Sequence, residues 1–144
     1  MRALLEFFLA YFDFLYLDPR FRITDSETAA DGANASLTVT GPTLTWALTN
    51  ERGQMQIAVA PTHLLTPRNW FWVSLIKQYL DNEAEIQYLP APDEALWMRE
   101  NSGRVEELFS DTSALETICD DLKVLRRTNA NTYWSTWREQ QGLT

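Results

Sequence analysis

The sequence predicts a single α+β domain over residues 1–144, with an N-terminal helix, a four-stranded antiparallel meander, and then helices packed on one face of the sheet. Apolar residues recur with period two between residues 20 and 60, which is typical of half-buried antiparallel strands. Before and after that segment they recur at the spacings of three and four that favour helices. With 45% hydrophobic and 12% aromatic residues, the chain can bury a core of its own.

Residues 2–17 are expected to form one helix that ends at Asp18-Pro19, because proline disfavours helix in the residue before it. Its water-facing stripe would consist of Arg2, Glu6, Ala10 and Asp13. Nearly all other positions in residues 4–17 are apolar or aromatic, so the helix is expected to be central or to form a homodimer with a second copy.

The same N-terminal segment is not expected to enter a membrane. Its longest uncharged piece, Phe7 to Phe12, is far shorter than the roughly 20 apolar residues of a membrane span. Glu6 and Asp13 interrupt the apolar run, and no small-residue cleavage site of a signal peptide follows. Cys119 is the only cysteine, so an intramolecular disulfide is impossible, and a reducing, cytoplasmic location fits best.

Four strands follow, each with apolar residues alternating with polar ones. The apolar members are Phe21 and Ile23, then Leu37 and Val39, then Leu44, Trp46 and Leu48, and finally Met55, Ile57 and Val59. Turns are expected at Asp31-Gly32, Gly41-Pro42 and residues 50–53, where Gly, Pro, Asn and Asp gather. The opposite face of this sheet would be rich in Thr, Ser and Gln.

Helices are expected to dominate the rest of the chain. Residues 61–67 connect the sheet to a helix over residues 69–80, with Asn69 as a possible N-cap. Residues 85–89 could add a short fifth strand. Further helices are expected over residues 93–101, 103–109 and 113–141. The last would be capped by Asp111, Thr112 or Ser113, and would run either as one helix or as two helices divided at residues 129–131. Its apolar stripe would consist of Leu115, Ile118, Leu122 and Leu125.

The net charge of −8 is concentrated in one segment. Residues 81–121 contain twelve acidic and two basic residues, a net charge of −10, whereas residues 1–80 carry −1 and residues 122–144 carry +3. Clustered carboxylates speed the encounter with a basic protein and repel nucleic acids and anionic membranes. We therefore expect a basic protein partner, no nucleic acid and no membrane.

The acidic segment is the predicted partner-binding surface. Its members are Asp81, Glu83, Glu85, Asp93, Glu94, Trp97, Glu106, Glu107, Asp111, Asp120 and Asp121. The alternative is a solvated face that keeps the protein soluble, because charge runs on helices are usually exposed to water. For Trp97 and Phe109 the core is favoured over the interface, because helices at that spacing need an apolar stripe.

No catalytic, metal or cofactor site is expected. His63 is the only histidine and lies in a loop, while Cys119 lies beside Ile118 and Leu122, where cysteine behaves as a small hydrophobic residue. One cysteine and one histidine offer no zinc pattern. Residues 81–92 resemble a calcium loop only faintly, since the sixth position is Ile86 and not glycine. No phosphate-binding glycine loop or dinucleotide motif is present.

The order of elements resembles small bacterial immunity proteins of polymorphic and contact-dependent toxin systems. The segments that carry the resemblance are Arg20-Phe21-Arg22-Ile23, Leu44-Thr45-Trp46-Ala47-Leu48-Thr49, Arg52-Gly53-Gln54 and Val105-Glu106-Glu107-Leu108-Phe109. The resemblance implies a cytosolic, often acidic α+β protein that binds and blocks a cognate toxin without catalysis. The expected function is neutralisation of a basic toxin such as a nuclease.

A second resemblance is to type III secretion chaperones, which are also small and acidic, mix helices with an antiparallel sheet, and dimerise through a helix. Residues 4–17 would suit such a dimer interface. The four strands expected in succession argue against this family, which divides its strands around a helix.

Overall fold

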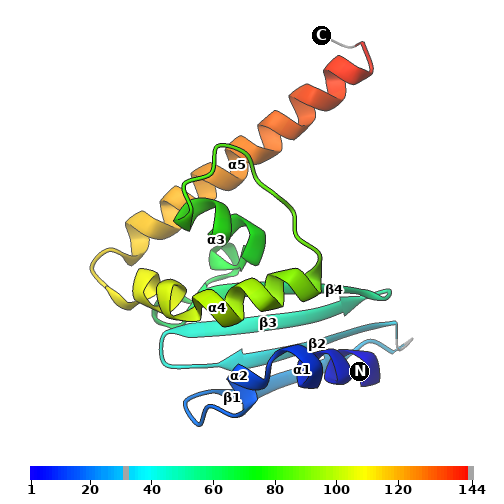
Figure 1. Cartoon of the computed structure of the whole chain (residues 1–144), viewed down its shortest axis with the longest axis vertical. Helices are drawn as coiled ribbons and strands as arrows, with labels where there is room; N and C mark the ends of the chain where they lie inside the picture. The colour runs from blue at the N-terminus through cyan, green and yellow to red at the C-terminus, as the bar shows by residue number, and fades with distance from the viewer. Residues whose placement is uncertain (31–32, 143–144) are drawn as a thin grey trace.

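The computed structural model describes residues 1–30 and 33–142 and has the α+β architecture that the sequence predicts (Figure 1). The elements in chain order are α1 (Arg2–Tyr11), α2 (Asp13–Tyr16), β1 (Arg22–Thr28), β2 (Asn34–Thr40), β3 (Leu44–Glu51), β4 (Gln54–Pro61), two 3₁₀ turns (Thr62–Leu64 and Pro67–Asn69), β5 (Phe71–Trp72), α3 (Val73–Leu80), α4 (Ala91–Ser110) and α5 (Leu115–Gln140). The turn expected at Asp31-Gly32 lies outside the described residues.

The sheet is a five-stranded antiparallel meander in the order β1-β2-β3-β4-β5. At its centre Val39 pairs with Trp46, which pairs with Val59, so these three side chains share one face. Helices α1 and α4 cover that face (Figure 1), and the three residues belong to the buried core. The opposite face carries half-buried polar residues such as Ser36 and Thr38, which confirms the predicted polar face.

The N-terminal helix is interrupted, so the expectation of one continuous helix is wrong. Phe12 separates α1 from α2 with φ −120° and ψ 33°. In a continuous helix residues 12 and 14 would project about 200° apart. The break instead brings the rings of both Phe12 and Phe14 to 5.8 Å from the ring of Trp46. Leu5 and Leu9 on α1 are exposed, so this helix is less covered than its composition predicts.

The first strand departs from the predicted alternation. All residues of β1 are exposed, and Ile23 is 52% exposed; the strand lies at the edge of the sheet, and its register shifts after Ile23. Charged residues on such an edge protect it from pairing with other chains. Phe21 packs against the backbone of Gly41 instead, where an added Cβ would lie only 2.2 Å from its ring.

The segment between β4 and α4 corrects three expectations. The helix expected over residues 69–80 begins only at Val73, because residues 71–72 pair with β4 as β5. Asn69 is not its N-cap; it is buried, and its side-chain nitrogen donates to the Leu64 carbonyl at 2.9 Å. Residues 85–89 form no strand.

The last two helices are longer and more continuous than expected. Helix α4 runs through Gly103 without a break, where separate helices over residues 93–101 and 103–109 were expected. Helix α5 likewise continues through residues 129–131. No side chain caps the N-terminus of α5; Asp111 instead accepts hydrogen bonds from the Ser113 backbone nitrogen and hydroxyl. A helix of 26 residues is about 39 Å long.

Figure 1 shows that α5 leaves the body of the molecule and carries the C-terminus far from the sheet. Residues 130–142 are all exposed. None of the helices in residues 1–30 and 33–142 is both long and apolar enough to cross a bilayer.

Candidate functional site

Helix α4 presents a row of carboxylates to solvent. Its buried residues, among them Ala95, Met98 and Val105, face the sheet and α5. Asp93 and Glu107 lie on the opposite side at a multiple of seven residues, and the row is completed by Glu100. Two helical turns separate successive members, a rise of about 10 Å. We call these three residues, with the exposed Leu96 between them, the acidic α4 face.

The carboxylates of the acidic α4 face have no cationic partner within ion-pair distance in the described part of the chain. The two arginines of the helix are occupied elsewhere. Arg99 pairs with Asp13, and Arg104 pairs with Asp81 at 3.1 Å. No ion pair among the described residues therefore neutralises the negative charge of this row.

Other members of the predicted binding surface are already paired. Lys77 contacts Asp81 at 3.6 Å and forms a shorter ion pair with Glu83, whose hydrogen bond raises the pKa of Lys77. Glu106 lies 3.6 Å from Arg20. The structure thus gives these carboxylates partners within the fold.

The carboxylates just before α5 and in its first half also have local partners. Hydrogen bonds from Ser113 lower the pKa of Asp111. Asp120 lies 4.0 Å from Lys123, and Asp121 accepts a hydrogen bond from the Tyr79 hydroxyl at 3.2 Å. Burial, and then the nearby Asp121 charge, raise the pKa of Tyr79. Glu85 is exposed in the connection between α3 and α4.

Glu94 and Trp97 face inward, unlike the rest of the predicted surface. Glu94 is 8% exposed, and its Oε2 accepts hydrogen bonds from the Ser74 backbone nitrogen at 3.0 Å and hydroxyl at 2.8 Å. Burial raises the pKa of Glu94, and the Ser74 bonds oppose that rise. Trp97 is half-buried against the core, and Phe109 is fully buried. We therefore leave Glu94 and Trp97 out of the docking surface.

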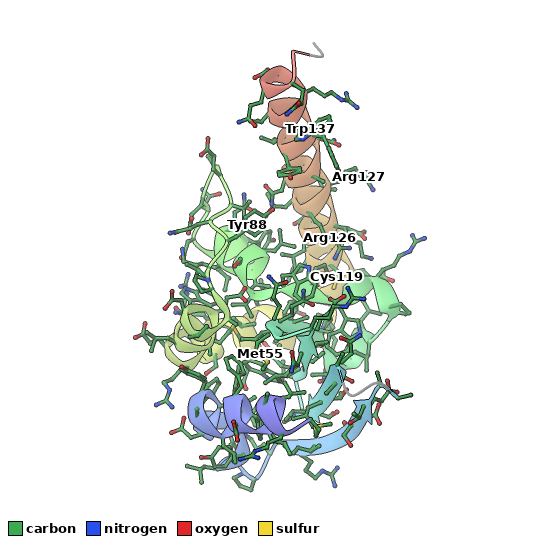
Figure 2. All side chains as sticks on the ribbon, turned by 90° about the vertical axis from the view of Figure 1, so that its right-hand side faces the viewer. Met55, Tyr88, Cys119, Arg126, Arg127 and Trp137 are labelled. Carbon is green, nitrogen blue, oxygen red and sulfur yellow. The ribbon has the colours of Figure 1, made fainter. Side chains whose placement is uncertain are left out.

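A cavity of about 730 Å³ adjoins Glu94. Five separate parts of the chain line it: α1, the turn and start of β4, β5 with the start of α3, the connection after α3, and the start of α4. Met55 and Tyr88, labelled in Figure 2, lie on two of these parts. The lining residues span positions 7 to 94, so no local sequence motif could have indicated the cavity.

The projecting half of α5, residues 130–140, carries three exposed aromatic residues that the sequence reasoning missed. Tyr133 and Trp134 have ring centroids 5.3 Å apart, and Trp134 and Trp137 lie 6.0 Å apart. The rings contact one another and are 41–59% exposed. The sequence does indicate these exposed aromatic residues, because they follow the point, Leu125, at which the apolar stripe of the helix ends.

Arg126 anchors α5 where it leaves the body. Its guanidinium donates to the Trp70 carbonyl at 3.0 Å and the Arg68 carbonyl at 3.3 Å, and it lies 5.3 Å from the centroid of the Phe71 ring. The neighbouring Arg127 is exposed and extends away from the body (Figure 2). Of these two neighbouring arginines, Arg126 therefore has a structural role, whereas Arg127 is exposed to solvent.

His63 and Cys119, the two residues weighed for catalysis, form no dyad among the described residues. His63 is exposed in the 3₁₀ turn after β4, and Cys119 is buried on α5, where burial raises the pKa of its thiol. No hydrogen bond links them in the described residues. Within residues 1–30 and 33–142, no group of three or more His, Cys, Asp or Glu side chains is placed to hold a metal ion.

The chain was compared with protein-family models, curated proteins and solved structures. No match was found in any of the three comparisons.

Proposed function

We propose that this protein is a non-catalytic inhibitor of the immunity-protein kind, which binds and neutralises a basic protein toxin such as a nuclease. The observation that carries the proposal is the acidic α4 face. Its three carboxylates lie in one row on a well-packed helix and have no cationic partner in the described part of the chain. A rigid row of like charges attracts and orients a basic partner.

The composition of the surface also fits a protein partner. Leu96 is exposed within the acidic α4 face and can pack against apolar surface once charge has brought the two proteins together. The projecting half of α5 adds exposed tryptophan and tyrosine, which are enriched in protein interfaces. Both features suit a partner with a basic surface and an apolar patch beside it.

The test is toxin neutralisation in cells that express the product of the neighbouring gene. The variant Asp93→Lys/Glu100→Lys/Glu107→Lys reverses the acidic α4 face. Its control, Asp25→Lys/Glu27→Lys/Glu51→Lys, makes the same change in net charge on exposed strand residues. We expect the first variant to lose neutralisation and the control to retain it. Equal loss in both variants, or no binding by the wild type, would contradict the proposal.

A second candidate is a dimeric chaperone of the type III secretion kind. The observation that favours it is the exposed apolar surface of the N-terminal segment, which includes Leu5 and Leu9 on α1 and Leu17 just after α2. This candidate requires a stable dimer that is disrupted by Leu9→Glu. A monomer in analytical ultracentrifugation at micromolar concentration would exclude it.

A further inference from the structure

The cavity beside Glu94 combines one charge with a largely apolar lining. Its volume of about 730 Å³ falls within the range of roughly 300–1,000 Å³ that small-molecule sites occupy. Of the residues that line it, Glu94 alone carries a formal charge. Most of the others are aromatic, aliphatic or proline residues. A ligand in this space would therefore meet a single carboxylate.

Aromatic rings form much of the cavity wall. Tyr11 comes from α1, Trp72 from β5 and Tyr88 from the connection that precedes α4. All three are partly exposed, Tyr88 by 71%, although their elements pack against the core. The faces of such rings carry negative electrostatic potential and attract cations, most strongly in tryptophan. The aromatic walls and the Glu94 carboxylate therefore both favour a positively charged ligand.

The Glu94 carboxylate is held in place before any ligand binds. The Leu89 backbone nitrogen donates to the Ser74 hydroxyl at 3.1 Å, and that hydroxyl donates to Glu94 Oε2 at 2.8 Å. The Ser74 backbone nitrogen donates to the same oxygen at 3.0 Å. This network joins the start of α3, the connection and α4. It fixes the orientation of the carboxylate and leaves Oε1 with no hydrogen-bond partner among the described residues.

The same carboxylate has no counter-ion. No lysine, arginine or histidine of the described chain lies within ion-pair distance of Glu94. The hydrogen bonds from Ser74 offset only part of the desolvation cost of this carboxylate, which accords with the raised pKa of Glu94. A cationic ligand would offset that cost, whereas an anionic ligand would increase it.

We propose that this cavity binds a small organic ammonium ion with an apolar body. The ammonium group donates a hydrogen bond to Glu94 Oε1, and the body packs against Trp72, Tyr88 and Met55. Selectivity follows from the two halves of the site. The carboxylate rejects anions, and the apolar wall disfavours strongly hydrated metal ions. This inference is independent of the proposed toxin partner, because the acidic α4 face lies on the other side of the helix.

The test compares two probes of the same shape on the wild-type protein. Hexylammonium carries the charge, and hexan-1-ol replaces it with a neutral hydroxyl. We expect saturable binding of hexylammonium in isothermal titration calorimetry, at least about tenfold tighter than hexan-1-ol, since charge-assisted hydrogen bonds are about twice as strong as neutral ones. Equal affinity of the two probes, or no saturable binding of hexylammonium, would overturn the proposal.

Three variants assign the effect to the site. Glu94→Gln keeps an acceptor for Ser74 and removes the charge, so we expect the two probes to bind within about threefold of each other. Trp72→Ala removes part of the cavity wall and should weaken the binding of both probes. Glu51→Gln neutralises an exposed carboxylate on the hairpin beside the cavity and should leave both affinities unchanged. A preference for hexylammonium that survives Glu94→Gln but disappears in Glu51→Gln would place the cation elsewhere and contradict the assignment.

Discussion

Helices α4 and α5 both belong to the C-terminal half of the chain, yet they meet the rest of the molecule differently. Helix α4 is packed along its whole length, from Ala95 to Phe109, and exposes one row of carboxylates. Helix α5 is packed only over its first half, where Leu115, Cys119 and Leu122 are buried. Residues 130–142 are all exposed. Charge on a fixed face and aromatic rings on a projecting end are thus separate surfaces.

The difference shows that the two halves of α5 contribute unequally to the stability of the fold. Most helical stability in proteins comes from tertiary packing rather than intrinsic propensity. The packed half of α5 is stabilised in this way, and its last described side-chain link to the body is the pair of hydrogen bonds between Gln78 and Asn129, at 2.7 and 3.2 Å. The projecting half contributes little to the core, so we expect substitutions of its aromatic residues to leave the protein folded.

The largest expected effect comes from comparing one side chain in each half of α5. Leu122→Ala removes a fully buried side chain and should lower the free energy of unfolding by about 2–5 kcal/mol. Trp137→Ala removes a larger side chain from the projecting half and should change it by less than about 0.5 kcal/mol. Urea denaturation measures both values. A loss above 2 kcal/mol for Trp137→Ala would show that the projecting half packs against the body.

A smaller effect is expected where the two halves meet. Arg126→Ala removes two hydrogen bonds to backbone carbonyls and the contact with Phe71, so the free energy of unfolding should fall by about 1–2 kcal/mol. Arg127→Ala, at the next residue, should change it by less than about 0.5 kcal/mol. Thermal or urea denaturation tests the pair. Equal effects would mean that Arg126 does not anchor the helix.

The smallest effect concerns the inward side of α4 and depends on pH. Because the pKa of Glu94 is raised in the folded state, the folded protein holds a proton that the unfolded chain has released above about pH 4.3. Glu94 therefore favours folding at low pH, and this contribution is lost as pH rises through the raised pKa. Glu94→Gln should gain stability relative to the wild type between pH 4 and pH 7. Urea denaturation at pH 4 and pH 7 measures the difference in free energy of unfolding between the variant and the wild type. The same difference at both pH values would contradict the raised pKa.

The sequence predicted the architecture where the pattern is local. The alternation from Leu37 to Val59 predicted the three central strands, because each buried residue pairs with a buried residue of the next strand. The pattern failed at Ile23, since an uncovered edge strand buries neither face. It also failed at residues 71–72, which look helical but pair with β4 through a contact distant in sequence.

The candidate sites were predictable to a different extent. Counting charges located the acidic segment. Once the length of α4 is known, helical spacing places Asp93 on the exposed side of the helix and Glu94 on the buried side. The expected breaks in α4 and α5 concealed that length. Partners such as Arg20 for Glu106 lie far away in sequence and emerge only in the folded chain. The cavity beside Glu94 has the same origin, since its walls come from five segments.

The acidic α4 face is tested most directly by the salt dependence of association with the neighbouring gene's product. The association rate constant of the wild type should fall steeply as ionic strength rises from 0.01 to 0.5 M, because salt screens long-range attraction. With Asp93, Glu100 and Glu107 changed to lysine, the rate at low salt should be roughly tenfold lower and nearly independent of salt. The control at Asp25, Glu27 and Glu51 should keep most of the wild-type slope. Equal slopes for the α4 variant and the wild type would contradict the proposed docking surface.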